Sequence, residues 1–147
     1  MHYCKNFSEL SVDELYRILK VREEVFIIEQ SCIYADIDDL DPQSSHLWIE
    51  ENGQINAYLR FFQRDDTTMQ IGRVLTRIRG VGLGRQIVAK GIDECFKKAG
   101  ITSIYIEAQC YAEGFYERLG FKSFGEPFDE DGIPHIKMRL RKDPHND

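Results

Sequence analysis

The chain lacks the features that mark several large classes of protein. It has no excess of positive charge, because its 147 residues carry a formal net charge of −6, whereas proteins that bind nucleic acid or anionic membranes are expected to be basic. No apolar run approaches the ~20 residues of a membrane helix. The cysteines form no C-x-x-C pair of the kind found in metal and redox sites. We therefore expect no nucleic-acid, membrane or metal partner.

Other features that the sequence lacks limit how the chain can be organised. The first residues, MHYCKN, lack the apolar core of a secretory signal, so we expect a cytoplasmic protein whose cysteines are reduced thiols. No His or Asp can be assigned as the partner of a cysteine nucleophile. Neither an internal repeat nor a low-complexity tract interrupts the sequence, and a length of 147 residues is typical of one domain. Residues 1–147 are therefore expected to form a single domain.

Apolar periodicity and turn signals divide the chain into strands and helices. The capping box that joins Ser11 to Glu14 starts a helix whose apolar positions continue to Phe26, and residues 28–45 follow as a long loop. Asn52-Gly53 predicts a tight hairpin. Further helices are expected at 82–99 and 112–119, and strands at 2–7, 47–51, 54–62, 69–76, 101–108, 121–124 and 133–140, with a loop at 126–132 between the last two.

This order of elements predicts an α/β fold with one mixed sheet of about six or seven strands and helices on both faces. The first strands form an antiparallel meander. The strands at 69–76 and 101–108 are joined by the helix at 82–99, and such crossover connections link parallel strands.

The most informative segment is the glycine-rich turn RGVGLG at 79–84, between an expected strand and a long helix. Glycine lets the backbone adopt positive φ and approach a ligand closely, and N–H groups at the start of a helix bind phosphate oxygens. Arg77, Arg79 and Arg85 concentrate positive charge here in a chain that is acidic overall. The turn predicts an anion site, with a plain tight turn and solvated arginines as the simple alternative.

Two common phosphate-binding motifs do not fit this turn. The Rossmann fingerprint requires G-x-G-x-x-G after the first strand, whereas Gly80, Gly82 and Gly84 stand at alternate positions after a later strand. A Walker loop requires G-K-[ST], which the sequence does not contain. The pattern indicates neither a dinucleotide-binding fold nor a P-loop NTPase.

Several segments together resemble the GNAT N-acetyltransferase superfamily. R-x-x-G-x-G at 79–84, after the strand IGRVLT at 71–76, resembles its acetyl-CoA-binding motif, and IYIEA at 104–108 followed by A-x-x-FY-x-x-x-GF at 112–121 resembles its second signature. The segments VR-x-x-VF-x-x-EQ at 21–30, AQ at 108–109 and EDGIPH at 130–135 resemble the ElaA branch. The resemblance spans nearly the whole chain. It implies the GNAT acyl-CoA N-acyltransferase fold, with acetyl-CoA as co-substrate and no metal.

The resemblance also implies roles for individual residues. The backbone of Val74, Leu75 and Thr76 would hold the pantetheine arm, with the Val74 N–H stabilising the tetrahedral oxyanion, and Gln109 would contact the cofactor. Tyr116 matches the tyrosine that protonates the departing thiolate, with a purely packed core aromatic as the alternative. The amides of the turn would hold the pyrophosphate, and its residues are Arg79, Gly80, Val81, Gly82, Leu83, Gly84 and Arg85.

The resemblance does not identify the general base, because the strand at 69–76 lacks the acid that many members carry there. Three side chains are candidates. Glu107 lies on the strand beside the expected cleft, where a buried carboxylate would hold its proton more tightly. Glu29 ends the first helix near the expected substrate entrance, and the imidazole of His135 suits proton uptake near neutral pH. Each has a structural alternative: an ion pair, a surface acid and a hydrogen-bonded histidine, respectively.

Charged residues outside these motifs have simpler interpretations. Arg73 is a long cation in an apolar strand, and we expect an internal ion pair with Glu107 or Glu29 rather than a contact with a substrate carboxylate. His46 is expected to begin a strand. The acidic loop is expected to be a solvated polar segment rather than a site that attracts a cationic amine, and its acids are Asp36, Asp38, Asp39 and Asp41.

The sequence favours an N-acetyltransferase that moves an acetyl group from acetyl-CoA to a primary amine of a small molecule or peptide by direct attack on the thioester. The alternative is a non-catalytic acyl-CoA-binding sensor or interaction module, which the missing strand acid favours. Acyl-homoserine lactone synthesis is a third interpretation, for which the chain is short. The oligomeric state stays open, with a homodimer as one option.

Overall fold

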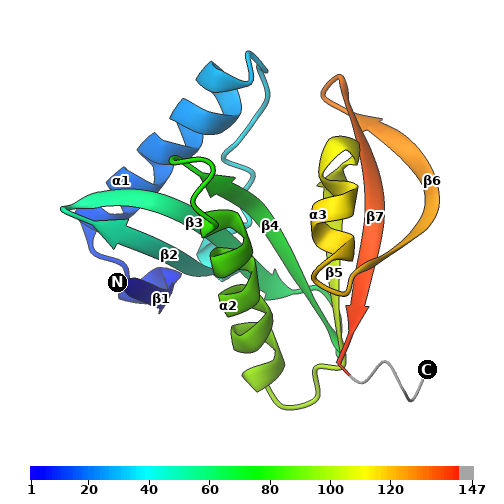
Figure 1. Cartoon of the computed structure of the whole chain (residues 1–147). Helices are drawn as coiled ribbons and strands as arrows, with labels where there is room; N and C mark the ends of the chain where they lie inside the picture. The colour runs from blue at the N-terminus through cyan, green and yellow to red at the C-terminus, as the bar shows by residue number, and fades with distance from the viewer. Residues whose placement is uncertain (143–147) are drawn as a thin grey trace.

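The structure is a computed structural model that describes residues 1–142, and its strands form one mixed sheet in the order β1-β2-β3-β4-β5-β7-β6 (Figure 1). The predicted α/β fold class is confirmed. The strands are β1 (His2–Asn6), β2 (Ser45–Glu51), β3 (Gln54–Gln63), β4 (Thr68–Thr76), β5 (Ser103–Gln109), β6 (Lys122–Glu130) and β7 (Ile133–Arg141), and the α-helices are α1 (Val12–Arg22), α2 (Leu83–Lys97) and α3 (Glu113–Glu117).

Helices cover both faces of this sheet. The core beneath α2 and α3 includes Leu47 and Leu59, whereas the core beneath α1 includes Trp48 and Tyr58, and all four are nearly inaccessible to solvent. These residues come from β2 and β3, where successive side chains point to opposite faces. Central strands with apolar residues on both sides therefore place the helices in two separate layers.

The helix α1 begins at the predicted capping box. The Glu14 N–H donates to Ser11 Oγ at 3.0 Å, and the Ser11 N–H donates to the Glu14 carboxylate at 2.9 Å. Beyond Arg22 the helix widens into a π-helical segment, Glu23–Glu29, which buries Val25 and Phe26. The following chain, residues 30–44, runs back from this segment past the central strands to the start of β2 (Figure 1).

The predicted loop at 126–132 is wrong. β6 and β7 form a long antiparallel hairpin that turns at Asp131-Gly132, and both turn residues have positive φ, 52° and 81°. A register shift between Phe124 and Phe128 accommodates Gly125 and Pro127 within the strand. Asp-Gly is itself a hairpin signal, and it brings the end of the hairpin toward the functional site.

Helix α2 lies close to the sheet because Gly91 faces β3. A Cβ atom at Gly91 would lie 2.9 Å from Leu59 Cδ2 and 3.4 Å from Ile71 Cδ1. Leu59 is completely buried, so its side chain has little room to move away.

We expect Gly91→Val to lower the free energy of unfolding by about 2 kcal/mol, because the added atoms overpack the interface between helix and sheet. Urea unfolding monitored by circular dichroism measures this loss. Ala89→Val is the matched control, since Ala89 lies exposed on the same helix and its variant carries only the small cost of a β-branched residue. Equal stabilities of the two variants would contradict the close packing inferred at Gly91.

Candidate active site

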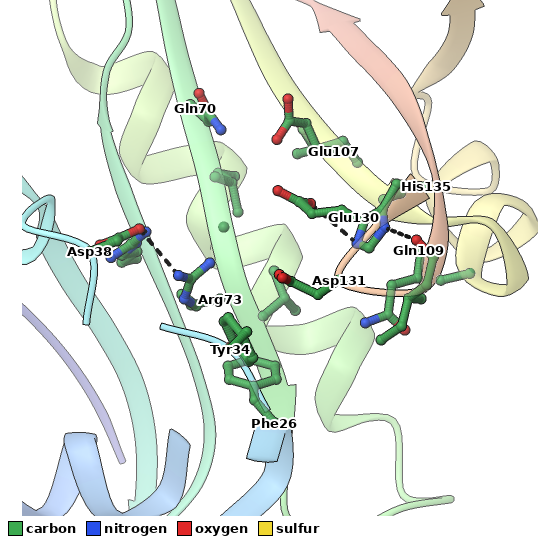
Figure 2. A pocket seen from close by; sticks show the side chains of 18 of the residues that line it. Phe26, Tyr34, Asp38, Gln70, Arg73, Glu107, Gln109, Glu130, Asp131 and His135 are labelled. Atoms are coloured by element: carbon green, nitrogen blue, oxygen red, sulfur yellow. Dashed lines mark hydrogen bonds and ion pairs between the residues drawn. The ribbon is translucent and has the colours of Figure 1, made fainter. Parts of the chain in front are cut away.

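A cleft of about 520 Å³ opens where β4 and β5 separate (Figure 2). The two strands are parallel, as predicted, but they pair only from Thr68 to Gln70 on β4, opposite Ser103 to Tyr105 on β5. Beyond these pairs, residues 71–74 of β4 and 106–109 of β5 line opposite sides of the cleft. The main chain of β4 therefore faces a ligand-sized space where a neighbouring strand would otherwise bind.

A bulge in β4 shapes this wall. Tyr58 pairs with Leu75 and Arg60 pairs with Gly72, so that Leu59 alone faces two residues of β4. The first of these, Arg73, has a φ of 52°, which L-residues rarely adopt. Bulges bend a strand and increase its twist, and this one accompanies the departure of β4 from β5.

An ion-pair network surrounds the bulge. Arg73 Nε lies 2.9 Å from the Asp36 carboxylate and Arg73 Nη2 lies 3.1 Å from that of Asp38. The other arginines continue the network: Arg60 binds Asp38 and Asp41, and Arg22 binds Asp36 and Asp41 at 2.9 and 2.7 Å. A further contact places the Arg73 guanidinium 5.5 Å above the Tyr34 ring. The network anchors the loop after α1 to the central strands.

Two predictions about these charges are therefore wrong. The acidic loop is not a solvated segment, because Asp36 and Asp41 are buried and Asp38 is half-buried; Asp39 alone of the four is exposed. Arg73 does form an internal ion pair, but with Asp36 and Asp38 and not with Glu107 or Glu29. The physical reason is that buried arginines require carboxylate partners, and the loop supplies them from a distant part of the sequence.

The network holds its acids in the charged form. Burial alone would raise the pKa of Asp38, but its hydrogen bonds to Arg60 outweigh that effect and lower the pKa to about 2. The pKa of Asp41 is lowered in the same way, with hydrogen bonds from Arg22 opposing the effect of burial. At neutral pH the cluster holds equal numbers of arginine and aspartate charges and is neutral as a unit.

His46 has a structural role next to this network. It lies in β2, as predicted, with Nδ1 2.7 Å from the Tyr58 hydroxyl and Nε2 3.1 Å from the carbonyl oxygen of Asp41. Because a carbonyl can only accept, Nε2 carries the proton and Nδ1 accepts from Tyr58. Burial lowers the pKa of His46, so the buried ring stays neutral.

The glycine turn is open to ligand. Gly80 and Gly82 have φ of 79° and 80°, and no atom lies within 4 Å of the position of a Cβ at either residue. α2 begins at Leu83, with Gly82 as its N-cap and no side chain capping its first amides. Arg79 lies against the turn, where its Nε donates to Thr76 Oγ1 at 2.9 Å. These unoccupied amides and the nearby arginine suit an anion.

Tyr116 lies at the side of the cleft beneath β5. Its ring packs edge-on against Phe115 and Phe121, with centroids 5.0 and 5.7 Å away, and the residue is 8% exposed. The hydroxyl has no hydrogen-bond partner within residues 1–142, and the residue lines the cleft. Burial raises the pKa of Tyr116 above its ordinary value, so the phenol remains protonated across the physiological range.

The structure brings two of the three candidate bases to the cleft. Glu107 and His135 line it from β5 and β7, whereas Glu29 lies outside the cleft lining and forms a half-exposed ion pair with Arg79 at 2.7 Å. Glu107 is exposed, not buried as considered from the sequence, and accepts a hydrogen bond from the Tyr105 hydroxyl at 2.7 Å. His135 is 8% exposed, and its Nδ1 lies 2.7 Å from the Ile133 carbonyl oxygen.

The hairpin brings two further acids to the cleft, Glu130 and Asp131, which the sequence reasoning did not propose (Figure 2). Glu130 Oε2 lies 3.6 Å from His135 Nε2. Cys32 Sγ lies 3.5 Å from the Asp131 carbonyl oxygen, so the loop after α1 meets the hairpin above the cleft. The Asp-Gly turn signal could have located these acids, because a tight hairpin carries them beside His135.

The geometry corresponds to a known family. A family model described as an acetyltransferase (GNAT) domain matches residues 7–142. The chain belongs to the GNAT acetyltransferase family. A UPF0039 protein of Synechocystis is 39% identical over 146 residues, which is 96% of this chain and 95% of that protein. ElaA of Escherichia coli is 39% identical over 137 residues, covering 89% of this chain and 90% of that one. These relatives confirm the resemblance to the ElaA branch.

Solved structures show the same GNAT fold. The crystal structure of Escherichia coli ElaA has a TM-score of 0.90 at 34% identity and covers 96% of this chain and 99% of its own. An acyl-CoA N-acyltransferase from Pseudomonas aeruginosa has a TM-score of 0.89 at 36% identity, with coverages of 95% and 99%. An acyl-homoserine lactone synthase with a TM-score of 0.81 is only 13% identical, so that likeness shows the fold alone.

Membership of the GNAT family makes this chain an acyltransferase that uses acyl-CoA, and the cleft fits that co-substrate. The open glycine turn offers amides for a diphosphate, and the separated strands expose the main chain of β4 for an extended arm. Within residues 1–142 no group of three or more His, Cys, Asp or Glu side chains is placed to hold a metal ion. None of the helices in the same range is both long enough and apolar enough to cross a membrane.

Proposed function

We propose that this GNAT protein transfers an acetyl group from acetyl-CoA to a primary amine of a small molecule or peptide, by direct attack of the amine on the thioester. The observation that carries the proposal is the separation of β4 from β5, with the open glycine turn at the start of α2. Tyr116, whose hydroxyl has no hydrogen-bond partner within residues 1–142, lines the same cleft. The acetyl group is proposed because the matching family model is described as an acetyltransferase domain.

Binding falls to the residues of the turn and of β4. The amides of residues 80–85, with Arg79 and Arg85, would hold the pyrophosphate. The main chain of Val74, Leu75 and Thr76 would hydrogen-bond the pantetheine arm much as one strand pairs with another, and Gln109 would contact the arm from β5. Bound acyl-CoA supplies an activated carbonyl carbon at the cleft.

Three groups would then act on the reacting atoms. The Val74 N–H would stabilise the oxyanion that forms when the amine attacks. Tyr116 would protonate the departing thiolate, because it lines the cleft and a phenol carries its proton at neutral pH. The acceptor amine must lose a proton, and we assign this role to His135 directly or through water.

The tautomer of His135 supports this assignment. A carbonyl oxygen cannot donate, so the Nδ1 atom that faces Ile133 carries the proton and Nε2 is left with its lone pair. Glu130, at 3.6 Å from Nε2, would stabilise the imidazolium that forms. Glu107 already accepts a hydrogen bond from Tyr105, and Glu29 forms an ion pair with Arg79 and does not line the cleft. Neither is therefore as well placed as His135 to act as the base.

Gly82→Ala tests the cofactor site. We expect the dissociation constant for CoA, measured by calorimetry, to rise about tenfold or more, because alanine resists the positive φ and moves the amides away from the diphosphate. Gly100→Ala is the matched control, since Gly100 has a φ of 85° with open space around it and lies beyond the other end of α2. Both variants should lose about 1 kcal/mol of stability, and equal CoA affinities would contradict the proposed cradle.

Release of free thiol from acetyl-CoA in the presence of a panel of primary amines tests the activity. Turnover with an amine supports the transferase. CoA binding without turnover of any amine would favour the acyl-CoA-binding module, the alternative suggested by the absence of an acid in residues 69–76.

A further inference from the structure

The positive charges along the cleft are already neutralised. Arg60 and Arg73 are the arginines that line it, and no lysine does. Both are held by Asp36, Asp38 and Asp41 in the network around the β4 bulge. An acceptor carboxylate would have to displace one of these aspartates, so the cleft offers no ready site for an anionic substrate.

The opposite wall of the cleft carries carboxylates that are not paired with a lysine or arginine within residues 1–142. Glu107, Glu130 and Asp131 line the cleft, and within residues 1–142 none of them forms an ion pair with a lysine or arginine. Figure 2 shows all three side chains on the side of the cleft opposite Arg73, directed toward the space between the strands. Lys137 stands opposite Glu107 in the β5–β7 register but does not line the cleft. The wall is therefore negatively charged at neutral pH.

Part of the cleft lining is apolar. Phe26, Phe62, Ile106 and Ile133 contribute to it, in addition to the carboxylates and the arginine network. An apolar surface of this kind suits a chain of methylene groups. A compact, fully polar acceptor would gain little from contact with this surface.

Tyr116 adds a hydrogen-bond donor to the same cleft. The residue is 8% exposed, lines the cleft and has no hydrogen-bond partner within the described residues. Its hydroxyl is therefore free to hydrogen-bond a ligand that enters the cleft. The acidic wall and this hydroxyl line one cleft.

We propose that the acceptor carries a second positive charge and is an aliphatic diamine or polyamine, a proposal that rests on the transfer reaction proposed above. One amine would react near Val74 and Tyr116, the methylene chain would lie along the apolar lining, and the second ammonium would bind among Glu107, Glu130 and Asp131. Ammonium-to-carboxylate hydrogen bonds are about twice as strong as neutral ones, and the cleft partly excludes the solvent that would screen them.

Three amines with five carbon atoms each test the proposal: 1,5-diaminopentane, pentylamine and 5-aminopentanoate. They present the same reacting group and differ only in the far end, which is cationic, neutral or anionic. Titration calorimetry against the protein saturated with free CoA measures binding without requiring turnover. We expect the diamine to bind about tenfold more tightly than pentylamine, and 5-aminopentanoate to bind most weakly. The preference should shrink as the salt concentration rises.

Variants that remove one negative charge test whether the carboxylates of the cleft cause the preference for the diamine. Asp131→Asn suits the site because asparagine tolerates the φ of 52° found there, and Glu107→Gln keeps an acceptor for the Tyr105 hydroxyl. Each should reduce the ratio of diamine to pentylamine affinity by about threefold or more. Glu126→Gln is the control, since Glu126 is exposed on β6 and does not line the cleft, and it should keep the wild-type ratio.

Amine binding and thiol release together distinguish the proposed diamine acceptor from the proposed transfer activity. Pentylamine or 5-aminopentanoate binding as tightly as the diamine would overturn the inference, whatever the turnover. A preference that survives in both Asp131→Asn and Glu107→Gln would also overturn it. Tight diamine binding with no release of thiol from acetyl-CoA would instead overturn the proposed activity and leave the charge preference of the cleft standing.

Discussion

Tyr116→Phe is expected to lower kcat by about a hundredfold with little change in the melting temperature. The loss follows from the removal of the group that would protonate the thiolate, since a positioned acid contributes on the order of 10²-fold or more. Stability should change little, because the hydroxyl has no hydrogen-bond partner within residues 1–142 and the ring keeps its edge-on contacts with Phe115 and Phe121. Steady-state release of thiol and thermal unfolding measure the two effects.

The pH dependence sharpens this test. Because burial raises the pKa of Tyr116, the wild-type rate should show no loss of the acid at moderately alkaline pH. Tyr16→Phe is the matched control: Tyr16 is 67% exposed on α1, far from the cleft lining, and the variant should retain the wild-type rate. A Tyr116→Phe enzyme with full activity would remove Tyr116 from the mechanism and leave it as a packed core aromatic.

Asp41→Asn is expected to lower the free energy of unfolding by about 3 kcal/mol. Asp41 Oδ1 lies 2.7 Å from Arg22 Nη1 and 2.9 Å from Arg60 Nη1. The side chains of these arginines are 0% and 3% exposed. The neutral amide would leave two buried cations without one of their shared carboxylates, and breaking a buried ion pair in this way typically costs about 3–5 kcal/mol. Urea unfolding at neutral pH measures the change.

Asp39→Asn provides the control in the same loop. Asp39 is exposed, has no ionic or hydrogen-bonding partner within the described residues, and has a φ of 66° that asparagine readily adopts. This variant should differ from wild type by less than about 0.5 kcal/mol. Equal stability of Asp41→Asn and Asp39→Asn would show that the network contributes little beyond hydrophobic packing.

The difference between wild type and Asp41→Asn should also depend on pH. The folded protein lowers the pKa of Asp41, chiefly through Arg22 acting against the effect of burial. A lowered pKa stabilises the fold above the ordinary aspartate value of about 4 and loses this contribution as the pH falls toward the folded pKa. The stability difference should therefore be largest near neutrality and narrow below about pH 4.

Local signals in the sequence predicted the glycine turn and the elements around it. The three glycines of the turn, the capping box at Ser11 and the Asn52-Gly53 hairpin signal act over a few residues, so they can be recognised without knowing the fold. The parallel relation of β4 and β5 followed from the single helix that joins them. The pairing of β6 with β7 was predicted, but the first strand was predicted too short, with a long loop at 126–132. The register shift that keeps Gly125 and Pro127 within β6 depends on its pairing with β7.

Partners of charged side chains could not be predicted in the same way. Arg22 and Asp36 are 14 residues apart, Arg60 and Asp38 are 22 apart, and Arg73 and Asp38 are 35 apart. No periodicity links such positions, and an aspartate on a loop looks the same in sequence whether it is solvated or buried against an arginine. The expectation of a solvated acidic loop failed for this reason.

The sequence by itself determined the order of strands and helices, the glycine turn and the family to which the chain belongs, because these depend on short-range geometry and on motifs read along the chain. Only the tertiary structure decided which charges face the cleft. The bulge at Arg73 and the hairpin at Asp131 place neutralised arginines on one wall. On the other wall they place carboxylates that have no lysine or arginine partner within residues 1–142. That arrangement depends on distant segments packing together, which no local pattern records.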